Sequence, residues 1–315
     1  LVQALRLANE LDSPHVLVVA GCEARDLLEK ASRPPDSLHR ASELLERVIE
    51  FEAGIPALRK GLRPRSPSVP FAPPRLVINA LGKAQVERDG QPVSSPEWEN
   101  QRKVREIFYF LVSNPQGVTK ETIGLHFWPE SSAAQLKLQF KNAIYRLRHA
   151  LGPEIVLFNE DVFWFNRELD YEYDVEEFVA QISQARASED AQQRVELYRS
   201  ALSIYKGSYL PEADGAWVDI ERQRRRNLYI QAALSLAENQ FYLSDYPAAL
   251  ESCQSALAEE PSLEEAHRLA MRIHAARGNR AAVSRQYEQC KLILKSEVNA
   301  PPSEQTVALY ETLTR

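Results

Sequence analysis

Five prolines within residues 64–74 set the first limit on how this chain can fold. Proline fixes one backbone angle and lacks a backbone N–H group, so neither a helix nor a central strand continues through such a segment. The surrounding residues are basic, and no acid occurs between Glu52 and Glu87. We therefore predict an extended linker at 63–74 that separates a part at 1–62 from the rest of the chain.

The part before the linker has the periodicity of helices. Apolar residues recur three or four positions apart from Leu1 to Leu11 and again from Asp36 to Phe51. The chain begins with a leucine and contains a single methionine, Met271. We expect residues 1–62 to be the helical repeat tail of an upstream domain in a longer protein.

The composition excludes some classes of protein. Hydrophobic residues make up 44% of the chain and charged residues 26%, as in ordinary globular proteins, and no apolar run is long enough to cross a membrane. Cys22, Cys253 and Cys290 lack the spacing of a disulfide framework or a metal site, which predicts free thiols in a reducing cytoplasm. The net charge of −6 does not favour nucleic acid as a partner, so any DNA-binding surface must be local.

The spacing of apolar residues changes after the linker, and residues 75–172 predict a small domain of both strands and helices. Apolar runs at 76–78 and 84–86 indicate strands, and Asp89-Gly90 is a typical hairpin turn. Three helical patterns follow, at 99–113, 119–127 and 132–151. A second hairpin, around 159–161, ends the series, and this order predicts a winged helix-turn-helix.

The helical pattern at 132–151 contains the residues of this domain that are best suited to bind a ligand. Its apolar stripe consists of Leu136, Phe140, Ile144, Leu147 and Leu151. Its other faces carry Lys137, Lys141, Asn142, Tyr145, Arg146 and Arg148, and no acid interrupts them. Lysine and arginine neutralise phosphates, while asparagine and arginine bond the edges of adenine and guanine. The sequence therefore predicts a recognition helix in the DNA major groove, the simpler alternative being a solvated helix face.

Two further basic residues are weaker candidates for DNA contact. Lys103 lies near the start of the first helix and Arg167 at the end of the second hairpin, where each could reach a phosphate or stay solvated. The tip of that hairpin, 159–161, is acidic and argues against insertion into the minor groove.

The remainder of the chain is helical and contains a repeat of the tetratricopeptide period. Ser244–Tyr246 corresponds to Gly278–Arg280, 34 residues later. We expect Trp217 and the leucines of this half to build the cores between its helices, and the half to form one rigid unit with the winged helix. No P-loop, HExxH, GxSxG or GxGxxG motif occurs, so we predict no enzyme, catalytic residue, metal or cofactor.

Several dispersed motifs resemble those of a known family. The DNA-binding domain of SARP regulators (antibiotic regulatory proteins) is similar at Lys103–Phe108, Phe127-Trp128-Pro129 and Arg146–Gly152. The bacterial transcriptional activator domain that accompanies it is similar at Asp174–Phe178, Tyr205-Lys206-Gly207, Trp217 with Glu221-Arg222, and Pro302–Tyr310. Residues 1–60 bear a weaker similarity to the tetratricopeptide arrays of MalT-type regulators.

The resemblance implies a fold and a function. The fold is mainly α with small β hairpins: an OmpR-type winged helix at 75–172, followed by a tetratricopeptide-like activator domain at 173–315. The function is activation at repeated promoter sites on double-stranded DNA, with RNA polymerase or a second copy as partner. The DNA face implied by position is Leu138, Asn142, Tyr145, Arg146 and Arg148. The main alternative is a protein-interaction scaffold with a winged helix that does not bind DNA, which the acidic net charge and acidic hairpin tip favour.

Overall fold

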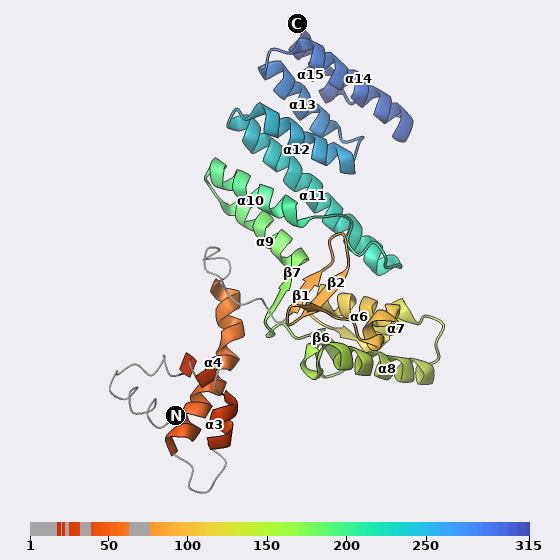
Figure 1. Ribbon diagram of the computed structural model, residues 1–315. Helices are drawn as coiled ribbons and strands as arrows, with labels where there is room; N and C mark the ends of the chain where they lie inside the picture. The colour runs from red at the N-terminus through yellow and green to blue at the C-terminus, as the bar shows by residue number, and fades with distance from the viewer. Residues whose placement is uncertain (1–17, 20, 23–24, 32–38, 63–75) are drawn as a thin grey trace, which may run out of the picture. The chain divides into compact units, whose positions relative to one another are not determined.

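The computed structural model describes residues 18–19, 21–22, 25–31, 39–62 and 76–315 (Figure 1). Its contacts group the chain into two units, one of residues 1–76 with 166–171 and one of residues 77–165 with 172–315. The predicted helix from Leu1 to Leu11 and the predicted linker at 63–74 lie outside the described residues. The boundary at that linker stays a prediction.

In the N-terminal unit, two helices pack against each other. They are α3 (Arg25–Ala31) and α4 (His39–Leu62). Their apolar cluster consists of Val18, Leu28, Leu44 and Val48. Gly21 permits the close packing, because a Cβ atom there would lie 2.7 Å from Val48 Cγ2. The helix predicted to end at Phe51 continues to Leu62.

A four-stranded sheet with strand order β3-β2-β1-β7 begins the winged-helix region. Its strands are β1 (Leu76–Asn79), β2 (Gln85–Arg88), β3 (Gln91–Pro92) and β7 (Tyr171–Tyr173). The predicted turn joins β2 to β3, and Asp89 and Gly90 both have left-handed backbone angles (φ 52° and 75°), as a two-residue hairpin turn requires. Strand β7 was not predicted, since a three-residue strand is fixed by its pairing rather than by its own pattern.

Four helices and a second sheet complete the winged helix. The helices are α5 (Pro96–Glu99), α6 (Arg102–Ser113), α7 (Lys120–Phe127) and α8 (Ala133–Leu151). The sheet, of order β4-β6-β5, contains β4 (Val118–Thr119), β5 (Val156–Asn159) and β6 (Val162–Phe165). The helix predicted at 99–113 is broken before Arg102. Arg105 Nη1 donates to the carbonyls of Trp98 (2.7 Å) and Glu99 (2.5 Å), which satisfies the end of α5.

Seven helices form the C-terminal half. They are α9 (Asp174–Ala187), α10 (Ala191–Ile204), α11 (Ala216–Tyr242), α12 (Tyr246–Glu259), α13 (Glu264–Ala276), α14 (Arg280–Glu297) and α15 (Glu304–Thr314). The two turns paired by the sequence repeat have the same design. Ser244 and Gly278 both have positive φ (61° and 71°), and the next residues, Asp245 and Asn279, cap α12 and α14 with their side chains.

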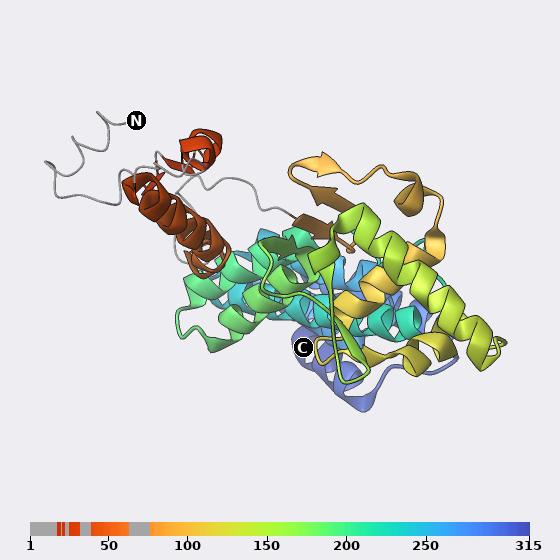
Figure 2. The same ribbon diagram turned by 90° about the horizontal axis from the view of Figure 1, so that it is seen from below.

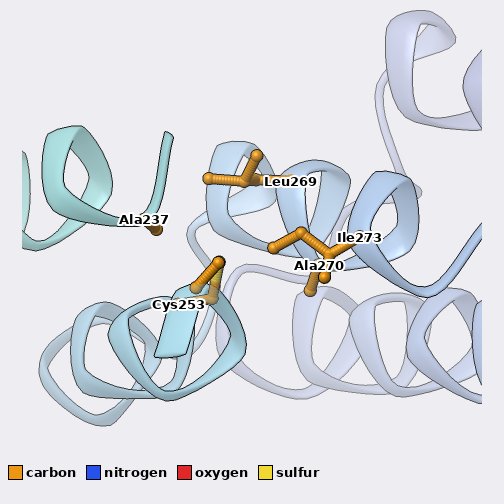
Figure 3. Close-up of a cluster of buried hydrophobic side chains, with 6 residues drawn as sticks. Ala237, Cys253, Leu269, Ala270 and Ile273 are labelled. Carbon is orange, nitrogen blue, oxygen red and sulfur yellow. The ribbon is translucent and has the colours of Figure 1, made fainter. Parts of the chain in front are cut away.

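Small side chains bring the repeat helices together (Figure 3). One cluster, from α11, α12 and α13, consists of Ala237, Ala249, Cys253, Leu269, Ala270 and Ile273. Burial raises the pKa of the Cys253 thiol to about 12, so this cysteine packs as a small apolar residue and is not reactive.

A loop between α10 and α11 joins the repeats to the winged helix within the second unit. Tyr209 is fully buried, forms an isolated antiparallel β-bridge with Leu81, and places its hydroxyl 2.7 Å from Ser113 Oγ in α6. Two backbone hydrogen bonds flank this bridge, from the Gly82 N–H group to the Ser208 carbonyl (3.0 Å) and from the Leu210 N–H group to the Ala80 carbonyl (2.8 Å). The loop therefore extends the backbone pairing beyond the end of β1.

Trp217 makes a second junction between the same two parts. Its ring lies 5.3 Å from that of Phe110 in α6 and 6.0 Å from that of Phe127 in α7, and its side chain is buried. The sequence predicts that Trp217 packs between the repeat helices. It packs against the winged helix instead, because the start of α11 lies on that domain.

Candidate nucleic-acid interface

Local capping signals define the predicted recognition helix, α8. Ser132 and Gln135 form a capping box: the Gln135 N–H group donates to Ser132 Oγ (3.4 Å), and the Ser132 N–H group donates to Gln135 Oε1 (2.9 Å). The helix ends at Gly152, whose positive φ (108°) suits glycine. The helix Ala133–Leu151 agrees with the predicted range 132–151, whereas the capping box was not predicted.

The apolar stripe fastens α8 to its domain. Phe140, Ile144, Leu147 and Leu151 are buried, and Leu136 is half-buried. Leu136 packs closely on α7, where a Cβ atom at Gly124 would lie 2.7 Å from Leu136 Cδ2. Each fully buried side chain of this size contributes about 1.5–3 kcal/mol, so the helix is held firmly from behind.

The opposite face of α8 is exposed and basic. In the view from below (Figure 2), α8 runs across the front of the winged helix. The exposed side chains are Lys137, Leu138, Lys141, Asn142 and Tyr145. Leu138 and Tyr145 are 61% and 67% exposed, which leaves two apolar groups among cations and an amide. This face can neutralise phosphates, bond base edges and contact a thymine methyl group.

Two arginines predicted for the same face are half-buried and bonded within the chain. Arg146 Nη1 donates to Gln101 Oε1 (2.7 Å), and Arg148 Nη2 donates to the Val156 carbonyl of β5 (2.9 Å). Position 148 borders the apolar stripe, so its side chain turns toward the adjoining strand. DNA contact by Arg146 and Arg148 stays a prediction, but the structure gives Arg148 the role of holding β5 to α8.

Lys103 and Arg167, the weaker candidates, also have partners. Lys103 Nζ donates to the Phe127 carbonyl at the end of α7 (2.9 Å) and lies 5.9 Å from the centre of the Trp128 ring. Arg167 belongs to the segment 166–171, which groups with the N-terminal unit, and its Nη1 donates to the Tyr171 hydroxyl (3.1 Å).

A hollow of about 170 Å³ between α6 and α8 brings three of the predicted residues together. They are Lys103, Asn142 and Arg146. Gln101 and Gln139 line the same hollow and were not predicted. Gln139 Oε1 accepts from Ser131 Oγ (2.9 Å), which leaves its amide nitrogen as a donor at this surface.

The wing is acidic at its tip, as predicted. Glu160 and Asp161 form the turn between β5 and β6 with positive φ (47° and 64°), and both are exposed. An aromatic contact holds the wing against α8, since the Phe163 ring lies 4.6 Å from that of Phe140. Within the wing, the Phe163 ring lies 4.4 Å from that of Phe158. Like charge makes this tip unsuited to a phosphate backbone.

Three arginines of α11 are bonded within the chain. Arg222 donates to backbone carbonyls of the junction loop, including that of Tyr209 (2.9 Å). Arg225 pairs with Glu221 (2.5 Å), and Arg226 pairs with Glu259 (3.5 Å). These contacts give the three arginines a structural role.

The described residues contain neither a candidate membrane span nor a candidate metal site. None of their helices combines the length and apolar character that a bilayer span requires. Nor do three histidine, cysteine, aspartate or glutamate side chains gather anywhere among them to hold a metal ion.

Comparison with known proteins places the C-terminal half in a family. Residues 173–314 match the bacterial transcriptional activator domain. No curated protein sequence matches the chain significantly. The structure of Mycobacterium tuberculosis EmbR in complex with a low-affinity phosphopeptide is similar with a TM-score of 0.64 and 19% identity, over 76% of this chain and 65% of EmbR. The TPR2B-domain:pHsp70 complex of yeast Sti1 gives a TM-score of 0.32 at 13% identity, over 45% of this chain and 96% of that one.

The likeness to EmbR concerns the fold, which is mainly helical with small sheets, and the chain spans about two thirds of EmbR. The activator-domain family consists of transcriptional regulators, which are not a class of enzyme. Residues 173–314 of this chain therefore match the bacterial transcriptional activator domain, and the fold of the chain is similar to that of EmbR.

Proposed function

We propose that the chain activates transcription by binding specific promoter DNA through α8 in the major groove. The observation that carries this proposal is the exposed face of α8. Lys137, Lys141 and Asn142 lie on it without an acid, while the rear face is fixed in the core. A rigid helix with phosphate-neutralising and base-reading groups is the arrangement that major-groove recognition needs.

In this proposal the helical repeats contact RNA polymerase or a second copy on an adjacent site. The junction at Tyr209 and Trp217 supports this part of the proposal, because it joins the repeats to the winged helix. A partner that contacts the repeats is then held beside the DNA to which the winged helix is bound. Two copies on one face of the DNA require sites about 10–10.5 bp apart, or a multiple of that spacing.

The test is a selection from random DNA duplexes with the whole chain, followed by binding to the enriched duplex at several salt concentrations. We expect the double variant Lys137→Glu/Lys141→Glu to lose affinity and about two units of the log-log salt slope, since each phosphate contact contributes about 0.9. Asn142→Ala should relax the preference at one base pair by about 1–3 kcal/mol.

A matched control is Lys291→Glu/Lys295→Glu, which reverses the same number of exposed charges on α14. It should leave the salt slope unchanged. If the α8 variant binds like the parent chain, the recognition helix is assigned wrongly.

The alternative is a scaffold whose winged helix binds a protein. The exposed Leu138 and Tyr145 and the acidic wing tip favour it. The same selection distinguishes the two functions, because a scaffold would enrich no duplex sequence.

A further inference from the structure

A cavity of about 180 Å³ lies between the winged helix and the loop that precedes α11. Its apolar walls are Trp98, Tyr109, Leu210 and Ala213, all of them buried side chains. An apolar cavity of about 150 Å³ can hold benzene, so this one has room for a six-membered ring and a short chain.

Charged groups also line the cavity, and two of them are already paired. Glu106 accepts from Arg102 Nε (2.7 Å), and Arg102 also pairs with Asp214. Arg105 and Glu212 are different. Arg105 uses only Nη1, for the two carbonyls at the end of α5, and Glu212 has no hydrogen bond or ion pair with any described residue.

The charges of Arg105 and Glu212 both affect the pKa of the same wall residue, Tyr109. Burial is the main cause that raises the pKa of Tyr109, and the charge of Glu212 raises it further while that of Arg105 lowers it. The charges of Arg105, which is bonded through Nη1 alone, and of the exposed Glu212 therefore both act on one aromatic wall. A ligand that bears a single charge would meet one of them favourably and the other unfavourably.

We propose that this cavity binds a small apolar amino acid in its zwitterionic form. Its carboxylate bonds the free edge of the Arg105 guanidinium, and its ammonium group pairs with Glu212. Its apolar side chain lies against Trp98 and Tyr109. Bidentate guanidinium–carboxylate contact is a strong and directional interaction, and the buried aromatic side chains supply an apolar contact surface.

The experiment compares three ring compounds by isothermal titration into the whole chain. L-phenylalanine has both charges, phenylacetate only the carboxylate, and phenethylamine only the ammonium group. We expect phenylalanine to bind at least about tenfold more tightly than either single-charge compound, since one charge-assisted contact accounts for about 1.4 kcal/mol or more.

Glu212→Gln is the decisive variant, because Glu212 makes no contact on which the fold depends. It should lower the affinity for phenylalanine and phenethylamine by about tenfold and leave that for phenylacetate unchanged or higher. Arg105→Gln should do the reverse, with thermal unfolding as a check because Arg105 also closes α5. Glu265→Gln, at an exposed position on α13, is the matched control.

Two results would overturn the proposal. One is the absence of heat and of any thermal shift with phenylalanine at millimolar concentration. The other is binding of phenylalanine that Glu212→Gln leaves unchanged, which would place the ligand elsewhere.

Discussion

Replacing Trp217 tests whether the winged helix and the repeats are energetically joined. A buried tryptophan cut to alanine usually lowers the free energy of unfolding by about 3–5 kcal/mol. Here the loss includes two ring contacts, with Phe110 and Phe127, each of about 0.5–1.5 kcal/mol. The indole Nε1 is buried without a hydrogen-bond partner among the described residues, so its removal recovers part of the loss. We expect Trp217→Ala to cost about 3 kcal/mol.

Trp217→Phe separates these effects. It keeps a ring at the junction and removes the unpaired N–H group, so we expect it to cost less than about 1 kcal/mol. Ile220→Ala, on the next turn of α11 and 67% exposed, is the matched control and should be almost neutral. Urea denaturation followed by circular dichroism gives all three values.

Hydrogen exchange gives the second measurement, because Trp217→Ala should speed exchange in both α6 and α11. The two parts are not energetically joined through Trp217 if Trp217→Ala costs less than about 1 kcal/mol, or if Trp217→Phe costs as much as Trp217→Ala. The same conclusion follows if exchange changes in α11 alone.

Three further predictions concern α8 and the repeats. Ser132→Ala removes the cap of α8 and should cost about 1 kcal/mol in urea denaturation. Arg148→Ala leaves the Val156 carbonyl without its donor and should cost about 1–3 kcal/mol, whereas Lys137→Ala should be almost neutral. His267 Nε2 donates to the Pro261 carbonyl (2.9 Å), Nδ1 accepts from Gln286 (2.7 Å), and burial lowers its pKa. The unfolded chain therefore binds more protons below about pH 6.5, and the free energy of unfolding should fall as pH decreases through that window, by up to about 1.4 kcal/mol per pH unit.

Each of these has its own contrary result. A Ser132→Ala chain as stable as the parent would show that the cap contributes nothing. Equal losses for Arg148→Ala and Lys137→Ala would place Arg148 in solvent. A pH profile that His267→Asn leaves unchanged would assign the acid sensitivity to another group.

The parts of the fold that sequence analysis predicted are those with local causes. Helix α8 begins at a capping box and ends at a glycine, and the β2–β3 turn needs two left-handed residues, which Asp89 and Gly90 supply. Strands β4 and β7 were missed because two or three residues carry no readable alternation, and their partners lie far along the chain.

The same distinction applies to the candidate site. The exposed residues of α8 followed from helical geometry alone. Arg148 lies beside the apolar stripe, where its direction depends on the position of β5. Trp217 could not be assigned either, because an apolar residue at the start of a long helix gives no sign of which neighbour covers it.

The bridge between Leu81 and Tyr209 has a consequence for how the chain is made. Ser113 and Tyr209 meet across 96 residues of sequence, so ribosomal synthesis delivers one side of this contact well before the other. Until the loop after α10 emerges, the Gly82 N–H group and the Ala80 carbonyl lack their protein partners there. The winged helix thus completes its structure late in translation, and a gene truncated after residue 172 would encode a domain with one edge left open.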